Sequence, residues 1–253
     1  MMESGEEMAV PAGIAGTEGQ PPRLGFGAKF WNLFVDPRKT FASIGRSHEW
    51  IILWIIVAVV SIAAYMPMKK IVQHDQIARV EERLQKTPQV TAEQRQEILD
   101  RMRSQFDNPL YLLFVPGAQI VILVIVAAIL LFIGNILLGG NTSYLKMLNA
   151  YAWTMMIVIP SSIVTVPLVM AKGSMDISLG LGALTTAETG AFVKKVLSSF
   201  ELFGLWQVWL SSVAVAVLAG VRTGKAFAAV FVTWLIWVLI QGGLATLGIS
   251  FGM

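Results

Sequence analysis

Long apolar runs, almost free of charged residues, recur five times along the chain. A transmembrane helix needs about 20 mostly apolar residues, because it crosses about 30 Å of hydrocarbon at about 1.5 Å per residue. The runs that meet this requirement are approximately residues 50–68, 110–138, 145–171, 202–221 and 226–247. Backbone polar groups inside a bilayer must be satisfied within the segment that carries them. The pattern therefore predicts an all-α membrane protein with a bundle of five spanning helices.

The segments between these runs are of two kinds. Residues 222–225 and residues 139–143, which include Gly139 and Gly140, are short and predict tight turns between antiparallel spans. The connection 69–108 is long and polar, and its apolar positions recur at helical spacing on either side of a central Pro. Thr91 and the Gln three residues later form a capping-box pattern. This connection predicts an extramembrane helical hairpin between the first two spans.

The N-terminal part divides at about residue 24. Residues 1–23 are rich in Glu, Gly and Pro and have no periodicity, which predicts a disordered tail and no cleavable signal peptide. In residues 24–48 aromatic residues recur at helical spacing, and Asp36-Pro37 has the pattern of an N-cap followed by the first helical residue. Two interpretations are open for this amphipathic segment: its helices lie on the membrane with basic residues facing headgroups, or its aromatic residues pack on the bundle.

Composition agrees with a membrane protein and excludes several functions. The chain is 55% hydrophobic and 14% charged, about half the charge of a typical soluble domain. It has no cysteine, so it has no thiol nucleophile, thiolate metal site or disulfide. The net charge of +3 does not indicate a nucleic-acid partner. The chain has no phosphate-binding loop or zinc-protease motif, so we expect no catalytic, cofactor-binding or metal-binding residues.

The five spans contain no Asp, Glu or His, which removes the groups that proton-coupled carriers and acid–base catalysts use. Their neutral polar residues include Asn135, Asn149, Ser161 and Ser162. Two interpretations are open for these residues: ordinary hydrogen bonds between helices, or a shared polar groove between the second and third spans. Small residues spaced four apart on the fourth span favour close helix packing and leave a homo-oligomer open.

Three motifs, in order along residues 28–247, resemble the Yip1 family, particularly its bacterial members. The first is Asp36-Pro37 followed by two basic residues and Thr-Phe. The second is Gly139-Gly140, then Tyr151-Ala152 and Pro160, although no Pro directly follows Ala152. The third lies at the junction of the last two spans and comprises Leu205-Trp206, Ala219-Gly220-Val221-Arg222 and Gly224-Lys225-Ala226. We interpret Asp36, Pro37, Gly139, Gly140, Tyr151 and Pro160 as structural positions.

The resemblance implies a cytoplasmic N-terminus and a C-terminus across the membrane. Eukaryotic members of the family act in vesicle trafficking, bind small GTPases and have no known catalytic residues, and some bacterial members are linked to ABC-type export systems. We therefore expect a non-enzymatic scaffold or adaptor in a bacterial inner membrane, whose hairpin 69–108 contacts a membrane-protein partner such as an ABC-type transporter. The alternative is a passive channel or lipid-handling protein that uses the polar groove.

Overall fold

The computed structural model describes residues 24–85, 89–108, 110–186 and 188–247. The predicted disordered tail, residues 1–23, lies outside them. Within the described residues the chain is helical and contains no β-strand, apart from a single antiparallel bridge between Gly180 and Glu201. Five helices are long and apolar enough to cross a membrane, which confirms the predicted all-α bundle of five spans. Those helices cover Glu49–Gln85, Leu112–Leu137, Tyr144–Lys172, Leu202–Ala219 and Thr223–Thr246.

Two short helices precede the first span. Helix α1 covers Phe26–Val35 and α2 covers Pro37–Ala42. Pro37 occupies the first position of α2, as predicted, because a proline has no N–H that would be left unpaired there. Asp36 stands at the N-cap position but makes no side-chain capping bond. Its carboxylate instead pairs with the Nζ atom of Lys39 at 3.1 Å.

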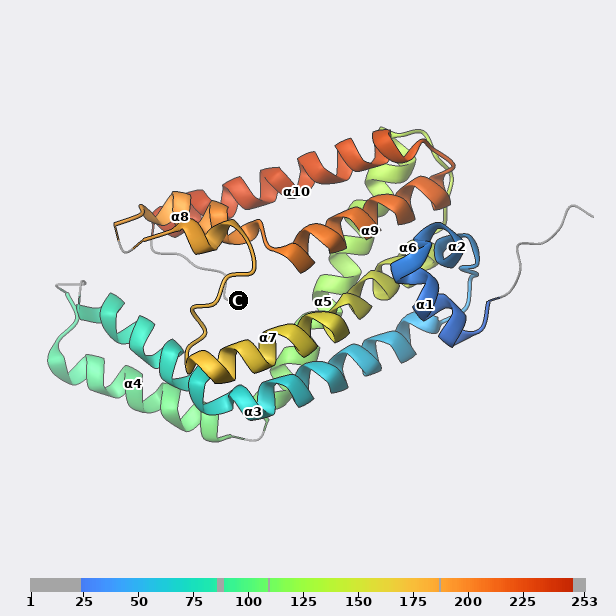
Figure 1. Ribbon diagram of the computed structural model, residues 1–253. Helices are drawn as coiled ribbons and strands as arrows, with labels where there is room; N and C mark the ends of the chain where they lie inside the picture. Colours follow the sequence, from blue (N-terminus) through green and yellow to red (C-terminus); the bar gives the residue numbers. More distant parts are fainter. Residues whose placement is uncertain (1–23, 86–88, 109, 187, 248–253) are drawn as a thin grey trace, which may run out of the picture.

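The first span and the first arm of the hairpin form one continuous helix, α3, which covers Glu49–Gln85. The sequence pattern suggested a boundary near residue 68, but the helix continues through Pro67. Its 37 residues extend for about 55 Å, well beyond the hydrocarbon thickness. Helix α4, Ala92–Asp107, returns beside the far half of α3 (Figure 1). Both bonds of the predicted Thr91–Gln94 capping box are present.

The second and third spans contain local departures from α-helical geometry. Helix α5, Tyr111–Phe132, passes through Pro116 and ends in a π-helical turn, η1 (Ile133–Leu137). The third span comprises α6, Tyr144–Thr154, a 3-10 turn, η2 (Met155–Ile157), and α7, Val158–Lys172. The 3-10 turn ends three residues before Pro160, which has no N–H to donate to the carbonyl of Met156 within that turn. This places the irregular turn of the third span near its middle.

The C-terminal half consists of two spans and a surface helix. The connection after α7 contains a 3-10 turn, η3 (Leu181–Leu184), and then α8, Ala191–Ser199. Helix α9 covers Leu202–Ala219, and α10 covers Thr223–Thr246. Gly220 ends α9 in the left-handed conformation at φ +70°, so three residues suffice to reverse the chain. Helix α8 lies against α10 so closely that a Cβ on Gly242 would approach the Phe192 ring to 2.9 Å.

The bundle has two distinct ends (Figure 1). One end carries α1, α2, the connection from α5 to α6 and the turn from α9 to α10. The other end carries α4, the far half of α3 and α8. The largest fully buried side chains include Leu33, Phe41, Trp153 and Leu210, from α1, α2, α6 and α9. The core is therefore centred where the N-terminal helices cover the spans.

Some aromatic residues of the N-terminal helices pack on the bundle, and another is exposed as it would be in a helix that lies on the membrane. Phe30 and Phe34 pack against the core and Phe41 is fully buried, as the packing interpretation requires. Trp31 is 68% exposed and points away from the bundle core. Helices α1 and α2 thus pack on the spans, while the Trp31 side chain of α1 remains on the outer surface.

Candidate functional site

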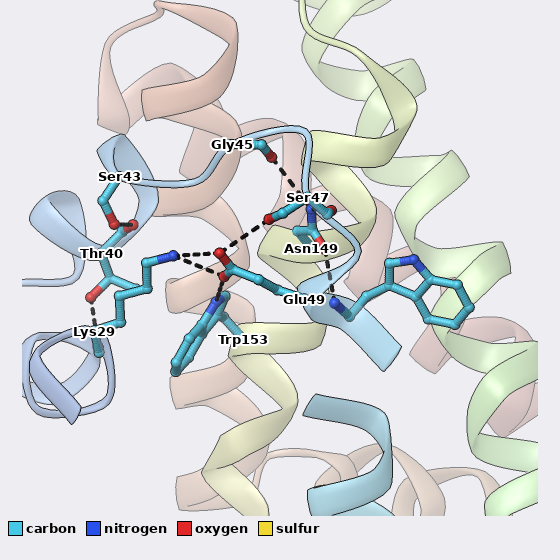
Figure 2. Close-up of polar contacts among 9 residues, drawn as sticks. Lys29, Thr40, Ser43, Gly45, Ser47, Glu49, Asn149 and Trp153 are labelled. Atoms are coloured by element: carbon cyan, nitrogen blue, oxygen red, sulfur yellow. Dashed lines mark hydrogen bonds and ion pairs between the residues drawn. The ribbon is translucent and has the colours of Figure 1, made fainter. Parts of the chain in front are cut away.

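The strongest polar cluster in the described residues lies where α1 meets the beginning of α3 (Figure 2). The Nζ atom of Lys29 lies 2.7 Å from Oε1 and 2.8 Å from Oε2 of Glu49. Lys29 is only 6% exposed, although it belongs to a surface helix. A buried ammonium is costly unless it is paired and hydrogen-bonded, so this contact fixes α1 against α3.

Two further side chains complete the shell of the Glu49 carboxylate. The indole N–H of Trp153, on α6, donates to Oε2 at 3.2 Å, and the Ser47 hydroxyl donates to Oε1 at 3.1 Å. The Lys29 ammonium also lies 6.0 Å from the centre of the Trp153 ring, within range of a cation–π contact. Glu49 therefore connects α1, α3 and α6 through one carboxylate.

Asn149 forms the second half of the cluster. It is fully buried on α6, and its Oδ1 accepts the backbone N–H of Trp50 at 2.9 Å. Its amide nitrogen donates to the carbonyls of Ser47 at 2.6 Å and Gly45 at 3.3 Å. Because the first N–H groups of a helix have no partner within that helix, Asn149 supplies one for the first turn of α3. The side chain thus holds the entry of the first span.

The structure does not bring the four groove residues into one contact network. Asn135 lies in the π-helical turn, where its amide nitrogen donates to the Thr142 carbonyl at 2.8 Å and its Oδ1 accepts the Thr142 N–H at 2.9 Å. It closes the turn between two spans, whereas Asn149 binds the segment before α3. Ser161 and Ser162 are half-buried on α7, and Ser162 lines a shallow apolar hollow between α3 and α7.

The family-like positions have identifiable structural contacts. Gly139 adopts φ +72°, and a Cβ on Gly140 would lie 2.4 Å from the Cβ of Ala219, so both glycines suit the tight turn beside α9. Tyr151 is buried and receives the Gln207 amide at 3.5 Å. In the motif that contains Asp36 and Pro37, the Thr40 hydroxyl donates to the Lys29 carbonyl at 2.8 Å, which holds α2 against α1.

The Lys29–Glu49 pair is absent from the residues singled out by the sequence pattern. The two residues stand 20 positions apart in different helices, so no local periodicity relates them. The available signals were a lysine within an aromatic run and a glutamate immediately before an apolar run. Neither signal identifies its partner without the packing of α1 against α3.

The hairpin is also tied to the second long connection. The Asp75 carboxylate, on α3, accepts the Met175 N–H at 2.6 Å and the Ser174 hydroxyl at 3.2 Å. The segment after α7 is therefore attached to the protruding part of α3. Within the described ranges, no three His, Cys, Asp or Glu side chains gather closely enough to hold a metal ion.

These features define a polytopic helical membrane protein whose polar cluster joins its surface helices to its spans. Comparison with known families identifies it further: the Yip1 domain matches residues 31–245, nearly the whole chain, so the chain belongs to the Yip1 family. No curated protein and no solved structure matches it.

Proposed function

We propose that the protein is a non-enzymatic membrane scaffold or adaptor whose α3–α4 hairpin binds a membrane-protein partner. The observation that supports this proposal most directly is the continuity of α3 from Glu49 to Gln85. A partner bound to the hairpin contacts the same continuous helix that forms the first span. That helix begins at the cluster that joins α1, α3 and α6.

The outer face of α4 is suited to such a contact. Leu99 and Phe106 are buried on the inner side of the hairpin, while Ile98 is exposed beside the charged residues Glu97 and Arg101. These exposed residues line a shallow surface hollow together with Val90. An apolar side chain surrounded by both charge signs fits a polar protein surface better than a lipid surface.

The proposal includes a location and a class of partner. We place the protein in a bacterial inner membrane with its N-terminus in the cytoplasm, as the family resemblance implies. Helix α3 then carries the hairpin to the opposite side, because α1 and α4 lie at different ends of the bundle (Figure 1). An ABC-type exporter, which has extramembrane parts on that side, is the partner class that the resemblance favours.

Co-purification in mild detergent tests the proposal. A double substitution on the outer face of α4, Ile98→Asp with Arg101→Glu, should release the partner and leave the bundle folded. Arg103→Glu, also exposed on α4, is the matched control and should retain the partner. Deletion of residues 72–105 should abolish binding as well. Retention of every partner by both the double variant and the deletion would refute the hairpin's role.

The alternative, a channel or lipid-handling protein, depends on free polar groups in the groove. The amide groups of Asn135 and Asn149 are instead bonded to backbone atoms. This occupancy favours the scaffold. Flux or lipid transfer can be measured in proteoliposomes that contain the wild type or the double variant Asn135→Leu with Asn149→Leu. Activity of the wild type that the double variant loses would favour the alternative.

A further inference from the structure

Charged residues in the described part of the chain divide unequally between the two ends of the bundle. The end formed by residues 24–50, 138–146 and 220–225 carries seven Lys or Arg but two Asp or Glu. The other end, formed by residues 69–107 and 172–201, carries ten of each within its described positions. The end that carries α1 and α2 therefore has a strong excess of positive charge, which the sequence order alone does not reveal.

The acidic residues at the positive end are already paired, since Asp36 binds Lys39 and Glu49 binds Lys29. Four other basic side chains at this end are exposed and form no ion pair with a described carboxylate. We define them as the basic end surface: Arg38, Arg46, Arg222 and Lys225.

A direct contact brings two parts of this surface together. The Nη2 atom of Arg38, on α2, donates to the Thr223 hydroxyl at 2.5 Å. Thr223 directly follows Arg222 and stands two residues before Lys225, so α2 and the turn from α9 to α10 present their cations side by side. Figure 1 shows α2 and this turn at the same end of the bundle. Residues 185 positions apart thus contribute to one surface.

Three of the four residues of the basic end surface stand at or beside the ends of candidate spans. Arg222 occupies the short link between the end of α9 at Ala219 and the start of α10 at Thr223. Arg46 stands three residues before Glu49, where α3 begins. Because these spans have the length and composition to cross a bilayer, we expect both positions to lie near the headgroup region. The charges of the hairpin, in contrast, are carried away from the membrane by α3.

We propose that the basic end surface binds the phosphate groups of anionic phospholipids in the leaflet that it faces. Guanidinium groups bind phosphate through paired N–H donors, and a leaflet rich in anionic lipid attracts basic residues near its surface. Helix α10 has no acidic residue in its first turn but has Arg222 at its N-cap and Lys225 after it. The helix dipole disfavours cations there, and a lipid phosphate relieves that cost. A soluble acidic partner is less suited, because the bilayer surface adjoins these side chains.

The test measures lipid preference of the full chain reconstituted in nanodiscs of equal parts phosphatidylglycerol and phosphatidylcholine. After gentle extraction, native mass spectrometry counts the lipids retained per chain. The wild type should retain phosphatidylglycerol preferentially. Replacement of all four residues of the basic end surface by Gln should reduce that preference by about a hundredfold or more, because each basic residue near an anionic surface contributes about fivefold.

A matched control removes the same charge from the other end: Arg79→Gln, Arg103→Gln, Lys172→Gln and Lys194→Gln, all at exposed positions. This control should keep the wild-type preference. The charge-preserving variant, with Lys at positions 38, 46 and 222, should keep most of it. If the fourfold Gln variant does not fold, Arg222→Gln with Lys225→Gln provides the same comparison and should show a smaller loss.

Four results would overturn the proposal. In the first, the wild type shows no preference for phosphatidylglycerol, and in the second, the two sets of Gln substitutions lower that preference equally. In the third, inorganic phosphate at matched ionic strength displaces the lipid. In the fourth, the wild type binds a poly-glutamate peptide but not phosphatidylglycerol. The third result would assign the surface to a free anion, and the fourth to an acidic protein.

Discussion

The ammonium of Lys29 contacts both carboxylate oxygens of Glu49, at 2.7 and 2.8 Å, across the boundary between the N-terminal helices and the first span. Trp153 and Ser47 donate to the same carboxylate. The pair therefore joins the surface helix α1 to the continuous helix that forms the first arm of the hairpin.

Removal of one partner of this pair should destabilise the protein. Lys29→Met leaves the Glu49 carboxylate with one charge partner fewer, and we expect a loss of about 2–4 kcal/mol, because Glu49 is still partly exposed. Lys29→Met combined with Glu49→Leu should recover most of that loss, since no unpaired charge remains. Denaturant unfolding in detergent measures both. Equal loss in the single and double variants would contradict this role of the pair.

Asn149 should contribute through its hydrogen bonds rather than its volume. Asn149→Leu keeps a similar size but leaves the Ser47 carbonyl and the Trp50 N–H without their partner. We expect a loss of about 1–3 kcal/mol, the cost of an unsatisfied buried polar group. Asn32→Leu is a suitable control, because its amide only bonds to the carbonyl of Ala28 within its own exposed helix turn. A similar effect of both changes would argue against the assigned role of Asn149.

Gly140 should tolerate no side chain. A Cβ at this position would lie 2.4 Å from the Cβ and 2.7 Å from the backbone oxygen of Ala219, so Gly140→Ala must separate the α5–α6 turn from α9. We expect a lower thermal unfolding temperature and less folded protein. Gly117→Ala is the control, because a Cβ there meets nothing within 4 Å and α5 gains helix propensity. A neutral Gly140→Ala would show that this turn packs differently.

Glu201 gives the stability a dependence on pH. Burial raises the pKa of this carboxyl, and the charge of Lys195 opposes that rise only in part. The pKa of Glu201 is therefore higher in the folded state than the value of about 4.3 in the unfolded state, so the folded state binds the proton more tightly. As the pH rises from below the unfolded-state pKa through the folded-state pKa, the free energy of unfolding falls. Glu201→Gln should therefore be more stable than the wild type at neutral pH and similar to it near pH 4. Unfolding at both pH values measures this, and an equal difference at both would contradict it.

The sequence pattern predicted the elements of this fold better than their contacts. Apolar run length identified the five spans because the bilayer imposes a minimum length on each helix. The Thr91–Gln94 capping box was predictable because all of its bonds are local. The continuity of α3 through Pro67 was not predictable, since a proline inside a helix removes a backbone hydrogen bond and usually marks a kink or an end.

The polar cluster shows the same limit. Asn149 was a candidate because a buried amide in a span needs partners, but its partners are the backbone of residues 45–50, which no periodicity relates to α6. Lys29 is buried because Glu49 and Trp153 approach it from other helices. Contacts between distant segments depend on tertiary packing, which a single sequence does not specify.

The central claim is that the α3–α4 hairpin binds a protein partner, and site-specific photocrosslinking tests it most directly. A photoreactive residue at Ile98, on the outer face of α4, should form a discrete adduct with another membrane protein in native membranes. The same residue at Ile163, exposed on the surface of α7, is the matched control and should react with lipid. The predicted result is a protein adduct at position 98 whose yield falls when excess unlabelled wild-type chain is present. Reaction of position 98 with water or lipid alone, as in the control, would contradict the account.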